Sequence, residues 1–196
     1  MVKKYLILAL LVLNTIYVFA DTWLPPKIKT IYSVNKEYML TVYPREYPKN
    51  YFTAKYQRQY KKGKVKDTIK PCHAILYHTS DSDTIEIWNK PLVNNVSPVN
   101  AIVANDGKSV ITIDDWHSKG FKHTFVIYGE GGELIGDFEL KDISPFPLEQ
   151  YGRSVSSIDW DEKVEYLDND RVEILFRNKE GEEQKRIFNI KTRAFE

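Results

Sequence analysis

Short runs of apolar residues alternate with polar residues and are separated by polar turns from about residue 31 onward. Alternation with a period of two is typical of β-strands that bury one of their faces. The runs at 126–128 and 172–176 are examples, and runs of this kind here are rich in valine, isoleucine, tyrosine and threonine. These residue types favour strands over helices. The pattern therefore predicts an all-β chain.

The strand pattern repeats along the chain. Residues 103–113 and 32–42 both contain a run, a polar turn and a second run, and another such pair follows each of them. A third, less regular copy comes later. Four runs joined by turns predict a four-stranded antiparallel unit. We expect three such units, at about 31–93, 100–142 and 155–191.

Only two segments have a helical pattern. Aromatic and basic residues recur three and four positions apart at 51–60, and residues 140–143 fit a single helical turn before Ser144-Pro145. Both are short, so they do not change the predicted fold class.

Units of four short strands, with turns at Asn105-Asp106-Gly107 and Gly131-Gly132, resemble the blades of bacterial β-propellers. The motif Asp114-Asp115-Trp116-His117-Ser118 is similar to the Asp-x-Trp-His-Ser motif of exported bacterial proteins with blade-like repeats. This resemblance implies a blade-like fold and no particular activity. Three units are fewer than the blades of a usual ring. We therefore expect an incomplete propeller or an open stack, with a β-sandwich as the alternative.

The first residues have the pattern of a secretory signal peptide. Lys3 and Lys4 precede an apolar run, and Val18-Phe19-Ala20 places small residues where signal peptidase requires them. The run is shorter than the roughly 20 apolar residues of a membrane-spanning helix. We predict a signal peptide at 1–20, a single all-β domain at 21–196, a secreted or periplasmic location and no stable membrane anchor after cleavage.

Charge and cysteine content limit the classes of partner and fold. The formal net charge is +1 at pH 7, so the overall charge does not favour a nucleic-acid partner, and the predicted export argues against one. Cys72 is the one cysteine, so the chain has no internal disulfide. We expect Cys72 to be buried as a small apolar residue.

The predicted repeats indicate which loops share an end of the molecule. The connection between the second and third strands is the basic insertion 44–71 in the first unit, 114–122 in the second and 168–171 in the third. If the units stack, these loops form one rim, where repeat folds often bind their ligands. The alternative is that the insertion only covers an exposed sheet edge.

The insertion interleaves tyrosines with basic residues, a composition suited to stacking and to pairing with anions. Together with the tryptophan of the 114–122 loop, they form the predicted binding residues: Trp116, Tyr51, Tyr56, Tyr60, Arg58, Lys61, Lys62 and Lys64. The expected partner is an anionic polymer, a glycan or another protein.

Asp114, Asp115 and His117 are the candidate catalytic residues, since a carboxylate beside an imidazole can serve acid-base chemistry. No nucleophile motif accompanies them. The structural alternative is that these carboxylates bind backbone amides of their own loop. Histidine and cysteine spacing predicts no metal site, and no cofactor motif is present. The sequence therefore favours an exported binding or interaction module, with a secreted hydrolase using Asp115 and His117 as the alternative.

Overall fold

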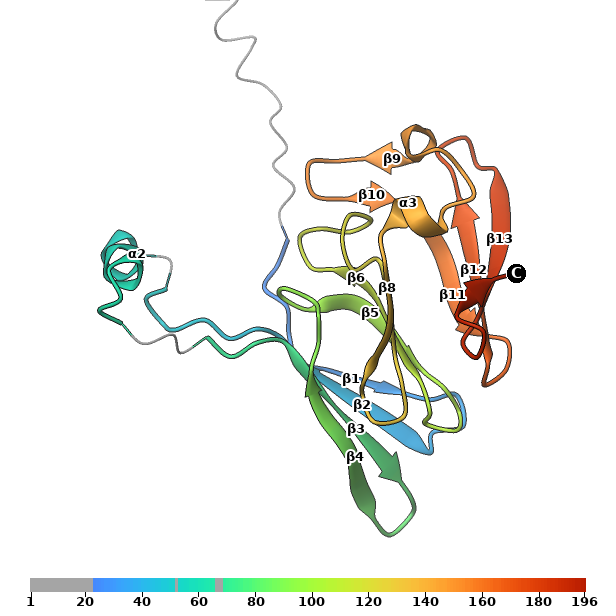
Figure 1. The fold of residues 1–196 in the computed structure, drawn as a ribbon, viewed down its shortest axis with the longest axis horizontal. Helices are drawn as coiled ribbons and strands as arrows, with labels where there is room; N and C mark the ends of the chain where they lie inside the picture. The colour runs from blue at the N-terminus through green and yellow to red at the C-terminus, as the bar shows by residue number, and fades with distance from the viewer. Residues whose placement is uncertain (1–22, 52, 66–68) are drawn as a thin grey trace, which may run out of the picture.

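The computed structural model describes residues 23–51, 53–65 and 69–196. Three four-stranded antiparallel sheets follow one another along the chain (Figure 1). The first consists of β1 (Lys29–Tyr32), β2 (Tyr38–Tyr43), β3 (His73–Thr79) and β4 (Thr84–Pro91). The second consists of β5 (Pro98–Val103), β6 (Val110–Asp115), β7 (Phe125–Tyr128) and β8 (Leu134–Phe138). The third consists of β11 (Asp161–Tyr166), β12 (Arg171–Arg177), β13 (Glu183–Asn189) and β14 (Ala194–Phe195). The all-β prediction is confirmed.

The remaining elements are short. They are the strand pair β9 (Gly152–Arg153) and β10 (Ile158–Asp159), the helices α2 (Ala54–Lys61) and α3 (Leu140–Ile143), and the 3-10 turn η1 (Leu148–Gln150). Both segments with a helical pattern therefore form helices. None of the helices in the described part of the chain has the length and apolar character needed to cross a membrane.

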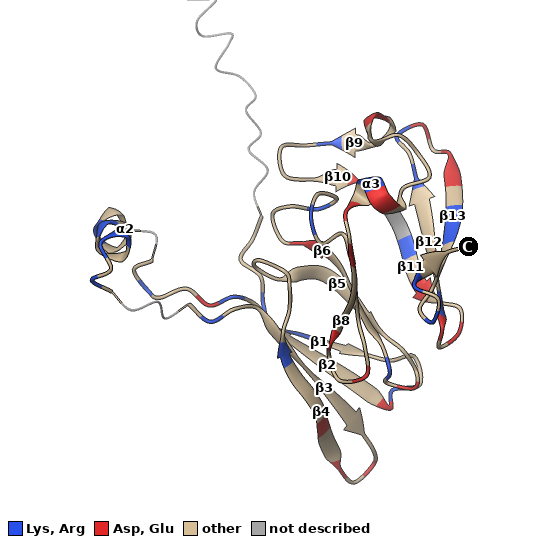
Figure 2. Cartoon of the chain, in the orientation of Figure 1, with Lys and Arg blue, Asp and Glu red and all other residues tan. Residues whose placement is uncertain are grey.

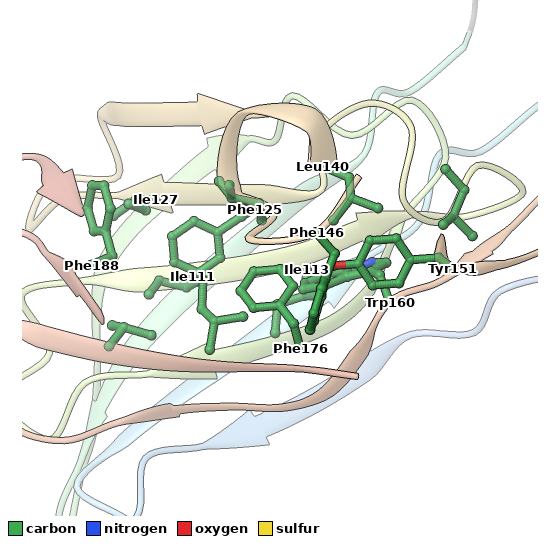
Figure 3. Close-up of a cluster of buried hydrophobic side chains, with 14 residues drawn as sticks. Ile111, Ile113, Phe125, Ile127, Leu140, Phe146, Tyr151, Trp160, Phe176 and Phe188 are labelled. Atoms are coloured by element: carbon green, nitrogen blue, oxygen red, sulfur yellow. The ribbon is translucent and has the colours of Figure 1, made fainter. Parts of the chain in front are cut away.

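The second sheet is the middle layer, and its central strands β6 and β7 are buried on both faces. Every residue of β6 and β7 is buried, because one core lies on each side of the sheet. Leu40, Leu76 and Trp88 of the first sheet pack against one face. On the other face, Phe125 of β7 shares a core with Phe176 and Trp160, and these rings point toward one another in Figure 3. Face-to-face packing of successive sheets is the arrangement of blades.

The stack is open. Strand β5 contacts β1 and β2 of the first sheet and β11 of the third, so the first strands of the sheets meet while the later strands spread apart (Figure 1). The described sheets close neither a barrel nor a ring. The prediction of blade-like four-stranded units in an open arrangement is confirmed.

The turn at 105–107 connects the first two sheets as well as two strands. Asn35 donates from its backbone to Oδ1 of Asn105 over 3.0 Å, and its side chain donates to the Asn105 carbonyl over 2.9 Å. Gly107 has φ +69°, and a Cβ there would overlap the ring of Tyr38. Glycine is needed both for the left-handed backbone and for this close approach.

The predicted strand order of the third unit is wrong by one strand. The first strand in the predicted unit 155–191 is β10, which pairs with β9 and not with β11. Trp160 explains the difference, since this residue is fully buried in the core and separates β10 from β11. The sheet is completed instead by β14.

This correction moves one loop away from the predicted rim. Residues 168–171 connect the first two strands of the third sheet, not the second and third. Asp168 and Asn169 line a pocket of about 250 Å³ together with Val34 and Asn105, beside the β1–β2 and β5–β6 turns. The prediction that 168–171 joins the other two loops is therefore wrong.

Cys72 lies in the core between the first and second sheets and is fully buried. Burial, and to a smaller extent the Asp115 carboxylate, raises the pKa of the thiol to about 12, while Arg45 acts in the opposite direction. The predicted signal peptide at 1–20 lies outside the described residues, so that expectation stays a prediction.

Candidate functional site

The base of the insertion and the 114–122 loop lie at the same end of the molecule. Both are held by the linker between the first two sheets: the Arg45 amide donates to the Val96 carbonyl over 2.8 Å, and the Trp116 amide donates to the Ser97 carbonyl over 2.8 Å. Two of the three loops predicted to form a rim are therefore adjacent. We call the surface formed by residues 23–26, 44–47, 96–97 and 114–122 the rim.

The far part of the insertion extends away from the sheets and carries α2 (Figure 1). Thr53 caps this helix by accepting from the Tyr56 amide over 3.2 Å. The rings of Tyr51, Tyr56 and Tyr60 pack on one another, with centroids 5.6 to 6.4 Å apart. The predicted tyrosines are thus brought together as a cluster of their own.

Basic side chains gather on and after α2 (Figure 2). Arg58, Lys61, Lys62 and Lys64 are all exposed. Trp116, by contrast, lies on the rim, where its ring meets that of Trp23 at 5.2 Å and its Nε1 donates to the Leu24 carbonyl over 3.0 Å. The predicted binding residues therefore divide into a distal basic helix and a tryptophan near the sheets.

Asp114 is fully buried and has a left-handed backbone, with φ 58°. Its Oδ1 accepts from the Gly120 amide over 2.6 Å, and its Oδ2 accepts from Nε1 of Trp160 over 3.0 Å. Gly120, with φ +76°, lies so close to β10 that a Cβ on it would be 2.8 Å from Cβ of Ile158. Asp114 thus ties the loop to the core of the third sheet.

Asp115 is also buried, with 2% of its surface exposed. Its carboxylate accepts from the backbone amides of Asn95 over 3.1 Å and Val96 over 3.4 Å. It therefore holds the linker between the first two sheets against the end of β6. Both aspartates make the backbone contacts that the structural alternative predicted.

His117 is exposed and also has a left-handed backbone, with φ 69°. Its ring lies against Trp23, with centroids 5.7 Å apart and planes at 62°. The structure therefore gives His117 and Asp115 different partners, an indole and backbone amides. The imidazole of His117 thus lies on the surface of the rim, whereas the carboxylates of Asp114 and Asp115 are buried beneath it and hold backbone amides.

A pocket of about 460 Å³ opens beside His117. Its walls are mostly apolar and rigid, and its polar groups are few. The lining residues are Trp23, Pro25, Pro26, Pro44, Arg45, Tyr47, Val96 and His117. Arg45 is half-buried, and its Nε is buried with no hydrogen-bond partner. A concave, mostly apolar surface with a few polar groups is the usual form of a small-ligand site.

Sequence reasoning missed Trp23, Arg45 and Tyr47 as site residues. Trp23 stands in a Trp-Leu-Pro-Pro segment far from the rim loops in sequence, and its ring contacts Trp116 and His117 there. Arg45 and Tyr47 belong to the predicted insertion but precede its basic run. The clue to Arg45 was its position directly after a strand and a proline, where a loop starts from a rigid scaffold.

Another pocket, of about 340 Å³ and with a polar lining, lies at the end of β8. Nδ1 of His123 lies 2.9 Å from a carboxylate oxygen of Asp137, and Lys122, Glu139, Lys141 and Asp142 complete the lining. A carboxylate can fix the tautomer of an imidazole in this way. The pair was missed because its members are fourteen positions apart and meet only by strand pairing.

Within the described ranges, no three His, Cys, Asp or Glu side chains are grouped so that they could hold a metal ion. The chain was also compared with protein-family models, curated proteins and solved structures. No family model matches it. No curated protein and no solved structure matches it either.

Proposed function

We propose that this chain is an exported binding or interaction module that holds its ligand at the rim. The observation that carries the proposal is the pocket beside His117, which brings together four segments that are separate in sequence: 23–26, 44–47, Val96 and His117. Aromatic and proline walls lose little conformational entropy when a ligand packs on them. Such a surface is suited to binding.

The partner of the module is anionic. The exposed basic side chains on and after α2 favour a negatively charged polymer, glycan or protein face. The half-buried Arg45 in the pocket has the same preference. We further propose a relation to exported bacterial proteins with blade-like repeats, which rests on the motif at 114–118 and on the three stacked sheets.

A hydrolase using Asp115 and His117 has less support. Acid-base catalysis needs a carboxylate or imidazole within reach of a substrate proton. The Asp115 carboxylate is buried and accepts from the Asn95 and Val96 amides. A binding role requires only the walls and the guanidinium.

The polymer part of the proposal can be tested with dextran sulfate as the anionic probe. Fluorescence anisotropy should report binding that weakens between about 50 mM and about 300 mM salt. Added salt shortens the Debye length and so screens the exposed charges that dominate this contact. The triple variant Lys61→Glu, Lys62→Glu, Lys64→Glu should lose most of this binding. A variant reversing three exposed lysines outside the insertion, Lys36→Glu, Lys90→Glu and Lys108→Glu, is the matched control, since no ion pair joins these lysines to another described residue. Equal loss in both variants would contradict a specific role of α2.

Export is tested separately. Protein recovered from the export compartment should begin at Asp21, as cleavage after Ala20 predicts. Mass spectrometry that finds intact Met1 on that material would contradict the predicted signal peptide.

A further inference from the structure

Arg45 has an unusual environment for a guanidinium. It follows Pro44 at the end of β2, and its own amide is fixed to the Val96 carbonyl. The side chain is half-buried, its Nε is buried without a partner, and no ion pair joins it to any residue in the described ranges. The carboxylate of Glu46, the next residue in the chain, does not pair with Arg45, since it forms an ion pair with Lys70 at 2.8 Å.

A buried guanidinium nitrogen without a partner is costly, because burial has removed the water that would otherwise bind it. Arginine presents a planar fork of donors that matches a carboxylate with two parallel hydrogen bonds. The pocket lining contains no aspartate or glutamate, and His117 adds a second group able to donate. The electrostatics of the pocket therefore favour an anion at Arg45.

The walls determine the rest of the ligand. Trp23 and Tyr47 provide aromatic surfaces, and Pro25, Pro26 and Pro44 provide rigid aliphatic ones. Flat apolar groups pack well on such surfaces. The volume, about 460 Å³, is in the range of small-ligand pockets, which run from roughly 300 to 1,000 Å³. The pocket has room for one ring or branched chain beside a single anionic group.

We infer that the pocket binds apolar carboxylates, with the carboxylate on the Arg45 guanidinium and the apolar body between Trp23 and Tyr47. The inference rests on the proposed binding function and names its ligand class. Two sources have this chemistry: a free small carboxylic acid, and the C-terminal residue of a peptide with an apolar side chain.

The probes for the test are 3-phenylpropionate and its uncharged amide, with binding measured by isothermal titration calorimetry. The acid should bind, and the amide at least about tenfold more weakly, because it lacks the charge that pairs with Arg45. Arg45→Gln should weaken binding of the acid by a similar factor and leave the amide unaffected. Arg58→Gln, which removes an exposed arginine from α2, is the matched control and should bind like the original protein.

The peptide Gly-Gly-Phe, with a free or an amidated C-terminus, separates the two sources. A free peptide that binds more tightly than 3-phenylpropionate indicates a peptide terminus, and the reverse order indicates a small acid. Thermal melting of each variant checks that it is folded, and Trp23→Phe provides a second, milder change in the pocket that should weaken both acids.

Equal binding of acid and amide, or an Arg45→Gln variant that binds the acid unchanged, would overturn the inference. So would the absence of binding by either acid at about millimolar concentration, the weak end of specific affinity. If dextran sulfate still binds in that case, the anionic-polymer part of the proposed function stands and the proposed ligand class of the pocket is wrong. If neither kind of probe binds, both proposals fail.

Discussion

Asp114 is a fully buried charged side chain and Arg45 a half-buried one, in neighbouring parts of the same rim. Asp114 accepts from the Gly120 amide and the Trp160 indole, so its carboxylate is satisfied by the fold. The buried Nε of Arg45 has no partner within the described residues. A buried polar group with partners holds the fold together, whereas one without them at the edge of a pocket leaves its side chain available to a ligand. The difference separates the part of the rim that holds the fold together from the part for which we propose ligand binding.

The largest effect should come from removing the satisfied charge. Asp114→Ala leaves Nε1 of Trp160 and the Gly120 amide as buried donors without their acceptor. It also places alanine at φ 58°. We expect a loss of about 3–4 kcal/mol in the free energy of unfolding, measured with urea.

Asp159→Ala is the control for this change. Asp159 is an exposed carboxylate at 3.4 Å from Nζ of Lys119, and such surface pairs contribute at most about 1 kcal/mol. If both variants lose the same stability, Asp114 has no special structural role.

Gly120→Ala should have the next largest effect. The added Cβ would lie 2.8 Å from Cβ of Ile158 on a backbone with φ +76°. A loss of about 2–3 kcal/mol is expected from strain and overlap together. Gly63→Ala separates the two causes, because Gly63 has φ +64° but nothing within 4 Å of an added Cβ. It should lose only about 1 kcal/mol. Similar losses at both sites would show that packing around Gly120 is loose.

The pKa of the Cys72 thiol responds to Arg45 and to Asp115, the second buried aspartate of the rim. Burial is the main cause of its rise to about 12, Asp115 raises it further, and Arg45 lowers it. The thiol of the unfolded chain ionises near 9.0 and that of the folded chain only near 12. The contribution of this thiol to the free energy of unfolding is therefore fully present below pH 9 and is lost as the pH rises toward 12. Denaturant titrations across this range should show the decrease, and Cys72→Ala should remove that part of it.

The same thiol should label slowly with a thiol reagent at pH 8 until denaturant is added, because thiolate is the reactive form and the residue is fully buried. Asp115→Asn should accelerate labelling slightly and Arg45→Met should slow it. Fast labelling of the native protein would contradict the buried environment.

Arg45→Met should have the smallest effect on stability. The change keeps an apolar stem of similar length and removes a charge that has no ion pair within the described ranges. We expect the free energy of unfolding to change by less than about 1 kcal/mol, in either direction. A loss as large as that of Asp114→Ala would mean that Arg45 belongs to the structural part of the rim.

Much of the fold could be predicted from the sequence because its strands are short runs of β-favouring residues, such as Phe125–Tyr128 in β7, separated by clear polar turns. The third unit could not be ordered correctly, since Trp160 interrupts an apparent strand for a reason that is tertiary: its indole reaches Asp114 in another sheet. Local patterns do not contain that contact.

The candidate site was only partly predictable. The meeting of the insertion base with the 114–122 loop followed from matching strand order in the first two units. The pocket did not follow, because Trp23 comes from a segment outside the repeats and Arg45 is distinguished only by its missing partner. A contact between segments far apart in the chain, as for Trp23, produces no local sequence pattern, and neither does a donor without a partner, as for Arg45.

The most direct test of the account is the ¹H–¹⁵N NMR signal of the Arg45 Nε–H group during titration with 3-phenylpropionate. The account predicts a saturable shift of this signal, as the Arg45 guanidinium gains a charged acceptor, and no such shift with the amide of the same acid. The exposed Arg58 signal should stay in place in both titrations. An Arg45 signal that does not move while the acid binds elsewhere would contradict the assignment of Arg45 as the group that receives the ligand.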